Sequence, residues 1–234
     1  MKPAVRLLLM LIVAVACAPA PRTAGEARAT TPLRRIPIQV DRAEAEIRAF
    51  EASDRIAPPA PGGIVFVGSS SIRLWRSLET DFPRLPVLNR GFGGSTLPEA
   101  IHYLPRAVLP YRPRTIVLYE GDNDLTFGWG PTRIADDYRT FVRTVRDALP
   151  STRVVFISLK PSPSRWHLVD QQREANRLVR EIVARDTLQT FVDVFTPMLG
   201  ANGRPRPELF VSDSLHMTPA GYAVWRAQVA PVLR

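Results

Sequence analysis

The chain has 234 residues, a formal net charge of +9 and one cysteine, and 45% of its residues are hydrophobic. These values are ordinary for a globular protein, and the length is sufficient for one domain with a good core. The arginines are scattered and form no dense run with interleaved aromatic residues, which argues against nucleic-acid binding despite the positive charge. Because Cys17 is the single cysteine, the mature domain can form no internal disulfide, and its stability must come from packing.

The first 20 residues have the pattern of an export signal. Lys2 and Arg6 provide a positively charged start, and Leu7 to Ala16 form an apolar stretch that is too short to cross a bilayer comfortably. We therefore expect residues 1–20 to be a signal peptide. The protein is expected in the bacterial periplasm or as a lipoprotein of the outer envelope, with free secretion less favoured.

Two processing patterns overlap at the end of this segment. Ala-Val-Ala-Cys at 14–17 resembles a bacterial lipobox, which would leave Cys17 lipidated and the protein anchored in a membrane. Ala-Pro-Ala at 18–20 resembles an ordinary cleavage site, which would remove Cys17. The lipoprotein is slightly favoured, and mass spectrometry of the mature N-terminus distinguishes the two. Residues 21–39 are rich in Pro, Ala, Thr and Arg without an apolar period, which predicts a flexible tether.

From residue 40 onwards helix and strand patterns alternate, and we expect one folded domain over 40–234. In chain order they predict a helix at 40–53, strands at 64–67 and 86–89, a helix at 97–108 interrupted near Pro105, a strand at 115–119, a helix at 132–149, a strand at 153–159, a helix at 169–184, a strand at 190–194 and a helix at 218–233. Thr218 is the expected N-cap of the last helix, with Pro219 as its first residue. Five alternating strands predict an α/β fold with three layers, α/β/α, around a flavodoxin-like parallel sheet.

Small or polar residues follow four of the predicted strands. They are Gly68–Ser71 after the first, Asn89–Thr96 after the second, Glu120–Asp124 after the third and Asp213–His216 beyond the fifth. In a parallel sheet these loops share one edge, where ligands bind in open α/β folds. Residues that are far apart in the sequence can therefore converge there.

The first of these loops places a serine between a buried strand and a helix. Ile64–Val67 is a short apolar run that ends at Gly68, and three serines open the amphipathic stretch that follows. Serines also cap helices, so a capping turn without chemistry is the alternative reading. The turn becomes a candidate nucleophile site only through the other loops.

Four motifs in this order resemble those of the SGNH (GDSL-type) hydrolase family, over about residues 62–233. The matching positions are Ser70 in Gly-Ser-Ser, Gly94 in the second loop, Asn123 in Gly-Asp-Asn-Asp, and Asp213 with His216 in Asp-Ser-Leu-His. Ser69 and Ser71 replace the Asp and Leu of the family's Gly-Asp-Ser-Leu signature. The resemblance implies the SGNH hydrolase fold, with Ser70, His216 and Asp213 as catalytic residues. It also implies an oxyanion hole from Ser70, Gly94 and Asn123.

The chemistry of these residue types fits the implied roles. A serine hydroxyl needs a base to take its proton, and a neutral imidazole such as that of His216 suits this near neutral pH. Asp213 lies three residues earlier, close enough in a turn to accept the other ring N–H and fix the tautomer. The backbone N–H groups of Ser70 and Gly94 and the Asn123 amide would stabilise the developing oxyanion.

Other residues of interest have simpler readings. Ser71 is the competing nucleophile, with Ser70 favoured by the family register. His102 and His167 have no aspartate at turn spacing and are expected to be surface or packing residues. Asp122 and Asp124 look like paired carboxylates; we expect one to be solvated and the other to order its loop by binding backbone N–H groups. No His, Cys or Glu cluster has metal spacing, so no metal or other cofactor is implied.

The sequence thus predicts an exported serine esterase or acylhydrolase whose substrate is a small ester, a lipid or an acylated sugar. One alternative is a carbohydrate O-acetyl esterase acting on polysaccharide. Another is a non-catalytic envelope protein that binds carbohydrate or lipid on the same fold, because fold alone does not decide function. Trp129 or Trp166 could line an acyl pocket, although tryptophans are more often packing residues.

Overall fold

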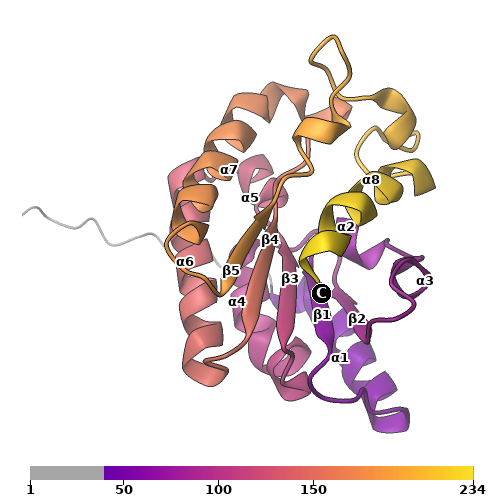
Figure 1. Cartoon of the computed structure of the whole chain (residues 1–234), viewed down its shortest axis with the longest axis vertical. Helices are drawn as coiled ribbons and strands as arrows, with labels where there is room; N and C mark the ends of the chain where they lie inside the picture. Colours follow the sequence, from indigo (N-terminus) through magenta and orange to yellow (C-terminus); the bar gives the residue numbers. More distant parts are fainter. Residues whose placement is uncertain (1–39, 234) are drawn as a thin grey trace, which may run out of the picture. The chain divides into compact units, whose positions relative to one another are not determined.

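A computed structural model of the protein describes residues 40–233 (Figure 1). The predicted signal peptide (1–20) and tether (21–39) lie outside these residues. In the described chain, five parallel strands form one sheet in the order β2-β1-β3-β4-β5. The strands are β1 (Ile64–Gly68), β2 (Val87–Gly91), β3 (Thr115–Tyr119), β4 (Arg153–Ile157) and β5 (Gln189–Val192). The predicted parallel sheet is confirmed.

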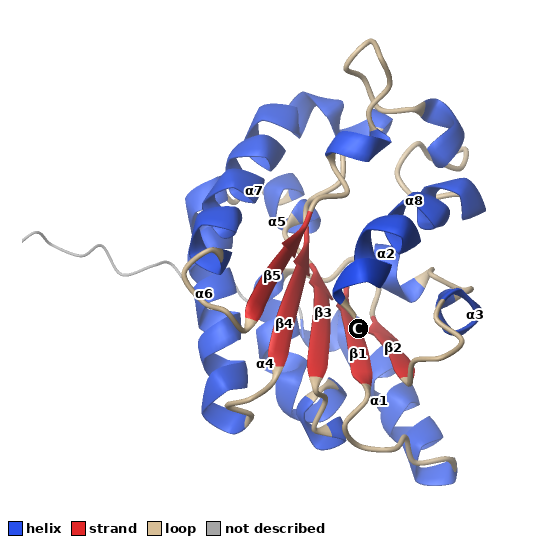
Figure 2. Ribbon diagram, in the orientation of Figure 1, coloured by secondary structure: helices blue, strands red, loops and turns tan. Residues whose placement is uncertain are grey.

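Helices cover both faces of the sheet, which gives the three predicted layers (Figure 2). They are α1 (Val40–Ile56), α2 (Ser70–Arg73), α3 (Leu78–Asp81), α4 (Leu97–Ala107), α5 (Asp122–Thr126), α6 (Pro131–Ala148), α7 (Val169–Val183) and α8 (Pro219–Val229). Val65 and Val67 of β1 belong to an apolar cluster with α1, α4, α6 and α7, whereas Ile64 and Phe66 pack with α2, α3 and α8. Successive strand side chains point to opposite faces, so this unbroken apolar run is buried on both sides.

The strand predicted at 153–159 is shorter in the structure, and its last predicted residue, Leu159, binds a helix instead of the sheet. Leu159 donates its N–H to Asn176 Oδ1 at 2.8 Å, and its carbonyl accepts from Asn176 Nδ2 at 3.0 Å. The buried Asn176 side chain of α7 thus binds both backbone polar groups of Leu159, and β4 ends at Ile157.

Helix ends also differ from the prediction around proline. Pro105 does not interrupt α4, which continues to Ala107. The last helix stops at Val229 and continues only as a 3-10 turn, because Pro231 lacks an N–H and restricts the residue before it. Its predicted N-cap is confirmed, since Thr218 Oγ1 accepts the N–H of Gly221 at 3.3 Å. The helix predicted to open at the serines after Gly68 is α2, which is only four residues long. The short helices α3 and α5 are absent from the predicted elements.

The strand β1 ends in a glycine at a point where no side chain fits. Gly68 has a φ of +142°, and a Cβ atom at this position would lie 2.1 Å from the carbonyl oxygen of Tyr119 in β3. The two backbones therefore come very close just before the serine turn. This contact fixes where the turn begins.

We predict that Gly68→Ala lowers the free energy of unfolding by more than about 2 kcal/mol, because the methyl group adds a backbone clash to the conformational strain. Gly128→Ala is the matched control: Gly128 has a φ of +80°, but nothing lies within 4 Å of its Cβ position. Urea unfolding of both variants measures the difference. Equal losses would contradict the steric explanation.

Candidate active site

A serine opens α2 at the carboxyl end of β1. Ser69 is the N-cap residue, and Ser70 is the first helical residue. The Ser69 N–H donates to the Tyr119 carbonyl at 3.2 Å, which extends the contact between β1 and β3 into the turn. Ser70 is partly exposed, whereas Ser71 is buried and its carbonyl accepts a hydrogen bond from the Tyr222 hydroxyl at 2.9 Å. The competing serine is therefore covered by α8.

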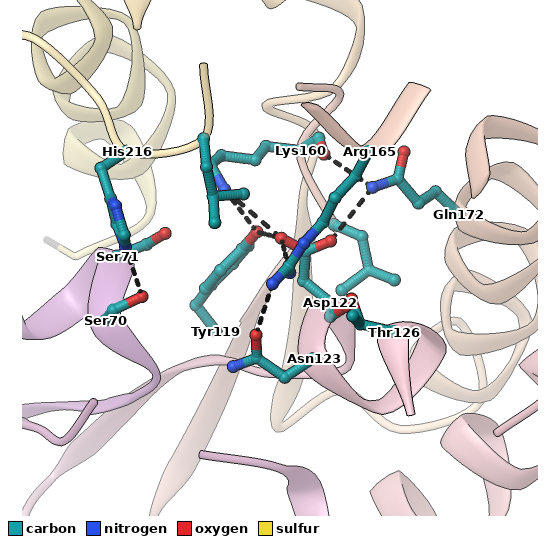
Figure 3. A network of polar contacts seen from close by, with 12 residues as sticks. Ser70, Ser71, Tyr119, Asp122, Asn123, Thr126, Lys160, Arg165, Gln172 and His216 are labelled. Atoms are coloured by element: carbon teal, nitrogen blue, oxygen red, sulfur yellow. Dashed lines mark hydrogen bonds and ion pairs between the residues drawn. The ribbon is translucent and has the colours of Figure 1, made fainter. Parts of the chain in front are cut away.

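The structure brings Ser70, His216 and Asp213 together in a chain of hydrogen bonds. His216 Nε2 lies 2.9 Å from Ser70 Oγ, and His216 Nδ1 lies 2.5 Å from Asp213 Oδ2. Figure 3 shows the imidazole between the serine turn and the loop before α8. Because the carboxylate only accepts, the neutral ring carries its proton on Nδ1 and leaves Nε2 free to accept from Ser70.

The loop that carries the histidine is organised by the aspartate of the same loop. Asp213 Oδ1 accepts the backbone N–H groups of Leu215 and His216, each at 2.9 Å. Ser214 has a φ of +59°, and its carbonyl accepts the N–H of Ser164 at 3.1 Å. The aspartate thus fixes both the ring and the backbone that presents it.

These hydrogen bonds also determine the charge of the aspartate. Burial acts to raise the pKa of Asp213, but the bonds from the His216 ring and from the His216 and Leu215 backbones outweigh it and lower the pKa to about 2. The carboxylate is therefore ionised at neutral pH. An ionised carboxylate at Nδ1 favours the imidazole tautomer described above and stabilises an imidazolium.

Asn123 and the loop of Gly94 meet beside this arrangement. Asn123, in α5, is buried and its Nδ2 donates to the Ser95 carbonyl at 2.8 Å. Gly94 precedes Ser95 and has a φ of +67°, a backbone conformation that favours glycine. The N–H of Phe92, in the same loop, donates to the Gly68 carbonyl at 2.9 Å. The structure therefore links the loops after β1, β2 and β3, as their shared sheet edge predicts.

A buried polar network next to Asn123 is absent from the sequence-based prediction. Asp122 contacts Arg165 Nη1 at 2.8 Å, Lys160 Nζ at 3.4 Å and Gln172 Nε2 at 3.1 Å (Figure 3). Burial acts to raise the pKa of Asp122, but the positive charges of Lys160 and Arg165 and the amide donor of Gln172 outweigh it and lower the pKa. The sequence signal for this network is Lys160, which directly follows a predicted buried strand, because a buried charge needs a partner.

The expectation that one of Asp122 and Asp124 is solvated is wrong, because both are buried. Asp124 accepts the Leu97 N–H at 3.1 Å and so orders the start of α4. It also accepts a hydrogen bond from its own backbone N–H, in line with the expectation that one of the two acids binds backbone N–H groups of its loop. Burial raises the pKa of Asp124 to about 7, against the lowering effect of its backbone hydrogen bonds. The pKa of Glu120 lies well above its usual range, also mainly because of burial. Glu120 accepts a hydrogen bond from Ser95 Oγ, so both acids bind residues that closely follow Gly94 in the chain.

Comparison with known proteins identifies the family. A model described as the GDSL-like Lipase/Acylhydrolase family matches residues 65–224, which is more than half of the chain and runs from β1 into α8. The chain belongs to this family. No curated protein matches the sequence.

Solved structures of GDSL-like and related proteins share the fold. A Streptococcus pneumonia protein whose name refers to platelet activating factor has a TM-score of 0.74 and 20% identity, over 83% of this chain and 94% of that chain. A GDSL-like lipase from Bacteroides thetaiotaomicron has a TM-score of 0.68 and 19% identity, over 81% of this chain and 97% of that chain. A variant of an acetyl-xylooligosaccharide esterase from Geobacillus stearothermophilus has a TM-score of 0.61 and 15% identity, over 75% of this chain and 95% of that chain. At these identities the likeness shows the fold.

The remaining residues of interest in this GDSL-like chain are two histidines and two tryptophans. His102 and His167 are exposed, as expected. The Arg133 guanidinium lies over the Trp129 ring at 4.1 Å, and that of Arg204 lies over the Trp166 ring at 4.6 Å. In the described part of the chain, no group of three or more His, Cys, Asp or Glu residues is arranged to hold a metal ion, and no helix has the length and apolarity to cross a bilayer.

The raised pKa of Asp124 predicts a pH-dependent effect on stability. An acid whose folded pKa is about 7 and whose unfolded pKa is about 4 destabilises the fold increasingly as the pH rises between these values. Asp124→Asn keeps an oxygen for the Leu97 N–H and removes the charge. The Tm of this variant relative to wild type should therefore increase from pH 5 to pH 8.

Asp136→Asn, at an exposed position on α6, is the control for this experiment and should show a constant difference from wild type. A constant difference for Asp124→Asn as well would contradict the assignment.

Proposed function

We propose that this GDSL-like protein is a serine esterase that cleaves carboxylic esters through an acyl-Ser70 intermediate. The observation that carries this proposal is the continuous contact from Ser70 Oγ through His216 to Asp213, with distances of 2.9 Å and 2.5 Å. The partly exposed position of Ser70 supports it, because the attacking oxygen must reach a substrate carbonyl.

In the proposed reaction, His216 Nε2 takes the Ser70 proton while Oγ attacks the ester carbonyl. The carbonyl oxygen becomes an oxyanion, and collapse of the tetrahedral intermediate expels the alcohol oxygen, which receives the proton from His216 Nε2. Water then attacks the acyl-enzyme with the same base, and Ser70 recovers its proton as the carboxylic acid leaves. Asp213 stays ionised and stabilises the imidazolium.

Three donors would stabilise the oxyanion: the Ser70 N–H, the Gly94 N–H and the second hydrogen of Asn123 Nδ2. The first N–H groups of a helix have no intrahelical acceptor, which suits Ser70 as the first residue of α2. Asn123 Nδ2 carries two hydrogens, and the Ser95 carbonyl takes one of them. Loss of one such donor costs on the order of a hundredfold or more in kcat.

An apolar acyl group is favoured by the surface near these loops. Among the described residues, the exposed large hydrophobic side chains include Phe127, directly after α5, and Val211, shortly before Asp213. Because each follows or precedes a site residue closely in the chain, these exposed side chains support an acyl chain as the preferred substrate group. The alternative substrate, an O-acetylated carbohydrate, would use less of this apolar surface.

Ser70→Ala should abolish labelling by an active-site fluorophosphonate and lower ester hydrolysis by roughly a thousandfold or more, because it removes the nucleophile. Ser71→Ala is the matched control and should keep both, since Ser71 is 3% exposed. Equal labelling of wild type and Ser70→Ala would remove Ser70 from the role.

The substrate class is tested with p-nitrophenyl esters from acetyl to long-chain acyl and with acetylated xylan, using wild type and Ser70→Ala. We expect wild type to turn over the p-nitrophenyl esters faster than the acetylated xylan. A preference for xylan would favour the carbohydrate esterase, and binding without turnover would favour the non-catalytic alternative.

A further inference from the structure

The side-chain amide of Asn123 is useful to the proposed reaction in only one of its two orientations. A carboxamide has one donor end and one acceptor end, and only the NH₂ end can stabilise an oxyanion. Rotation of the group by half a turn would present its oxygen instead. The protein therefore needs a device that selects the orientation.

Two contacts in the structure select the donor orientation. Arg165 Nη2 donates to Asn123 Oδ1 at 2.8 Å, and Asn123 Nδ2 donates to the Ser95 carbonyl at 2.8 Å. A guanidinium can only donate and a carbonyl can only accept, so both partners demand the same orientation. The reversed amide would place its NH₂ group against the guanidinium and its oxygen against the carbonyl.

The guanidinium is itself held in a fixed position. Arg165 Nη1 forms a salt bridge of 2.8 Å with Asp122 Oδ2, and the side chains are only 14% and 3% exposed. Asp122 also accepts from Lys160 and Gln172. Arg165 thus bridges two consecutive residues of α5 with two different nitrogens, and the buried contacts of the carboxylate oppose its movement (Figure 3).

The position of Arg165 in the chain also connects the two halves of the site. It lies in the 3-10 helix Pro163–Leu168 that follows β4. The preceding residue, Ser164, donates its N–H to the Ser214 carbonyl in the histidine loop. The same short segment therefore contacts the acid–base loop through its backbone and the amide of Asn123 through its side chain.

We infer that Arg165 is a positioning residue that orients and polarises the Asn123 amide, with Asp122 as its anchor. A positive donor on Oδ1 withdraws electron density from the amide and strengthens Nδ2–H as a donor, since linked hydrogen bonds reinforce one another. The effect is greatest when the oxyanion is present, so Arg165 contributes to kcat more than to substrate binding. This inference rests on the proposed ester hydrolysis.

The first test is a double-mutant cycle on a short-chain p-nitrophenyl ester. Arg165→Ala should lower kcat by about 10- to 100-fold and change KM by less than about threefold. Because Arg165 acts through Asn123, adding Arg165→Ala to Asn123→Ala should cost little more than Asn123→Ala alone. If the losses in kcat of the two single variants multiply in the double variant, or if Arg165→Ala changes KM alone, the inference is overturned.

Two further measurements separate positioning from general stability. Arg165→Lys keeps the charge but cannot bridge two residues with separate nitrogens, so it should fold like wild type by Tm and still lose most of the kcat lost in Arg165→Ala. Guanidinium chloride well below denaturing concentrations should partly restore kcat of Arg165→Ala, and ammonium chloride should not. Wild-type kcat in Arg165→Lys would overturn the inference.

Arg177→Ala, at an exposed position on the neighbouring helix α7 where Arg177 pairs with Glu174 and Glu181, is the control variant and should keep wild-type kcat. The outcome is distinguishable from a failure of the proposed function, because in that case wild type itself would show neither turnover nor labelling of Ser70. An active wild type with an indifferent Arg165 would reject only the role of Arg165.

Discussion

The packing of α8 against α2 is the constraint on which the site depends, because it joins two ends of the domain. His216 and Ser70 are 146 positions apart, and no local structure brings them together. Trp75, just after α2, stacks on Tyr222 of α8 at 5.4 Å and meets Trp225 edge-on at 5.9 Å. Tyr222 also donates to the Ser71 carbonyl. Aromatic contacts of this kind bury large areas and fix their geometry, so the histidine loop just before α8 is held above the serine turn.

A second constraint is the polar layer at the carboxyl edge of the sheet. Acidic and basic side chains, which are rarely buried in proteins, are here enclosed at the ends of β3 and β4. Burying such groups is costly unless they are paired or neutral. Asp122 is paired with Arg165 and Lys160, whereas burial favours the neutral form of Glu120. These buried groups hold the site loops in place, because loops bound to buried polar groups have few alternative arrangements.

Much of the architecture could be predicted from the sequence because it follows from local patterns. Short β-branched runs that alternate with amphipathic stretches define the parallel sheet, and a shared sheet edge explains why Ser70, Asn123 and Asp213 with His216 come together. The prediction failed where a residue's environment depends on distant partners. Asp122 and Asp124 look like loop residues in sequence. In the structure, Asp122 is paired with Lys160, Arg165 and Gln172, and Asp124 accepts a hydrogen bond from the first residue of α4. Arg165 could not be assigned from sequence, since its partner is on α5, beyond β4 and α6.

The central claim is that segments from β1, β2, β3 and the loop before α8 form one hydrolytic site. A crystal structure of the protein after reaction with a small alkyl fluorophosphonate tests it most directly. The account predicts a phosphorus–oxygen bond to Ser70 Oγ, with the phosphoryl oxygen accepting hydrogen bonds from the Ser70 and Gly94 backbones and from Asn123 Nδ2. An adduct on another residue, or a phosphoryl oxygen turned away from Asn123, would contradict it.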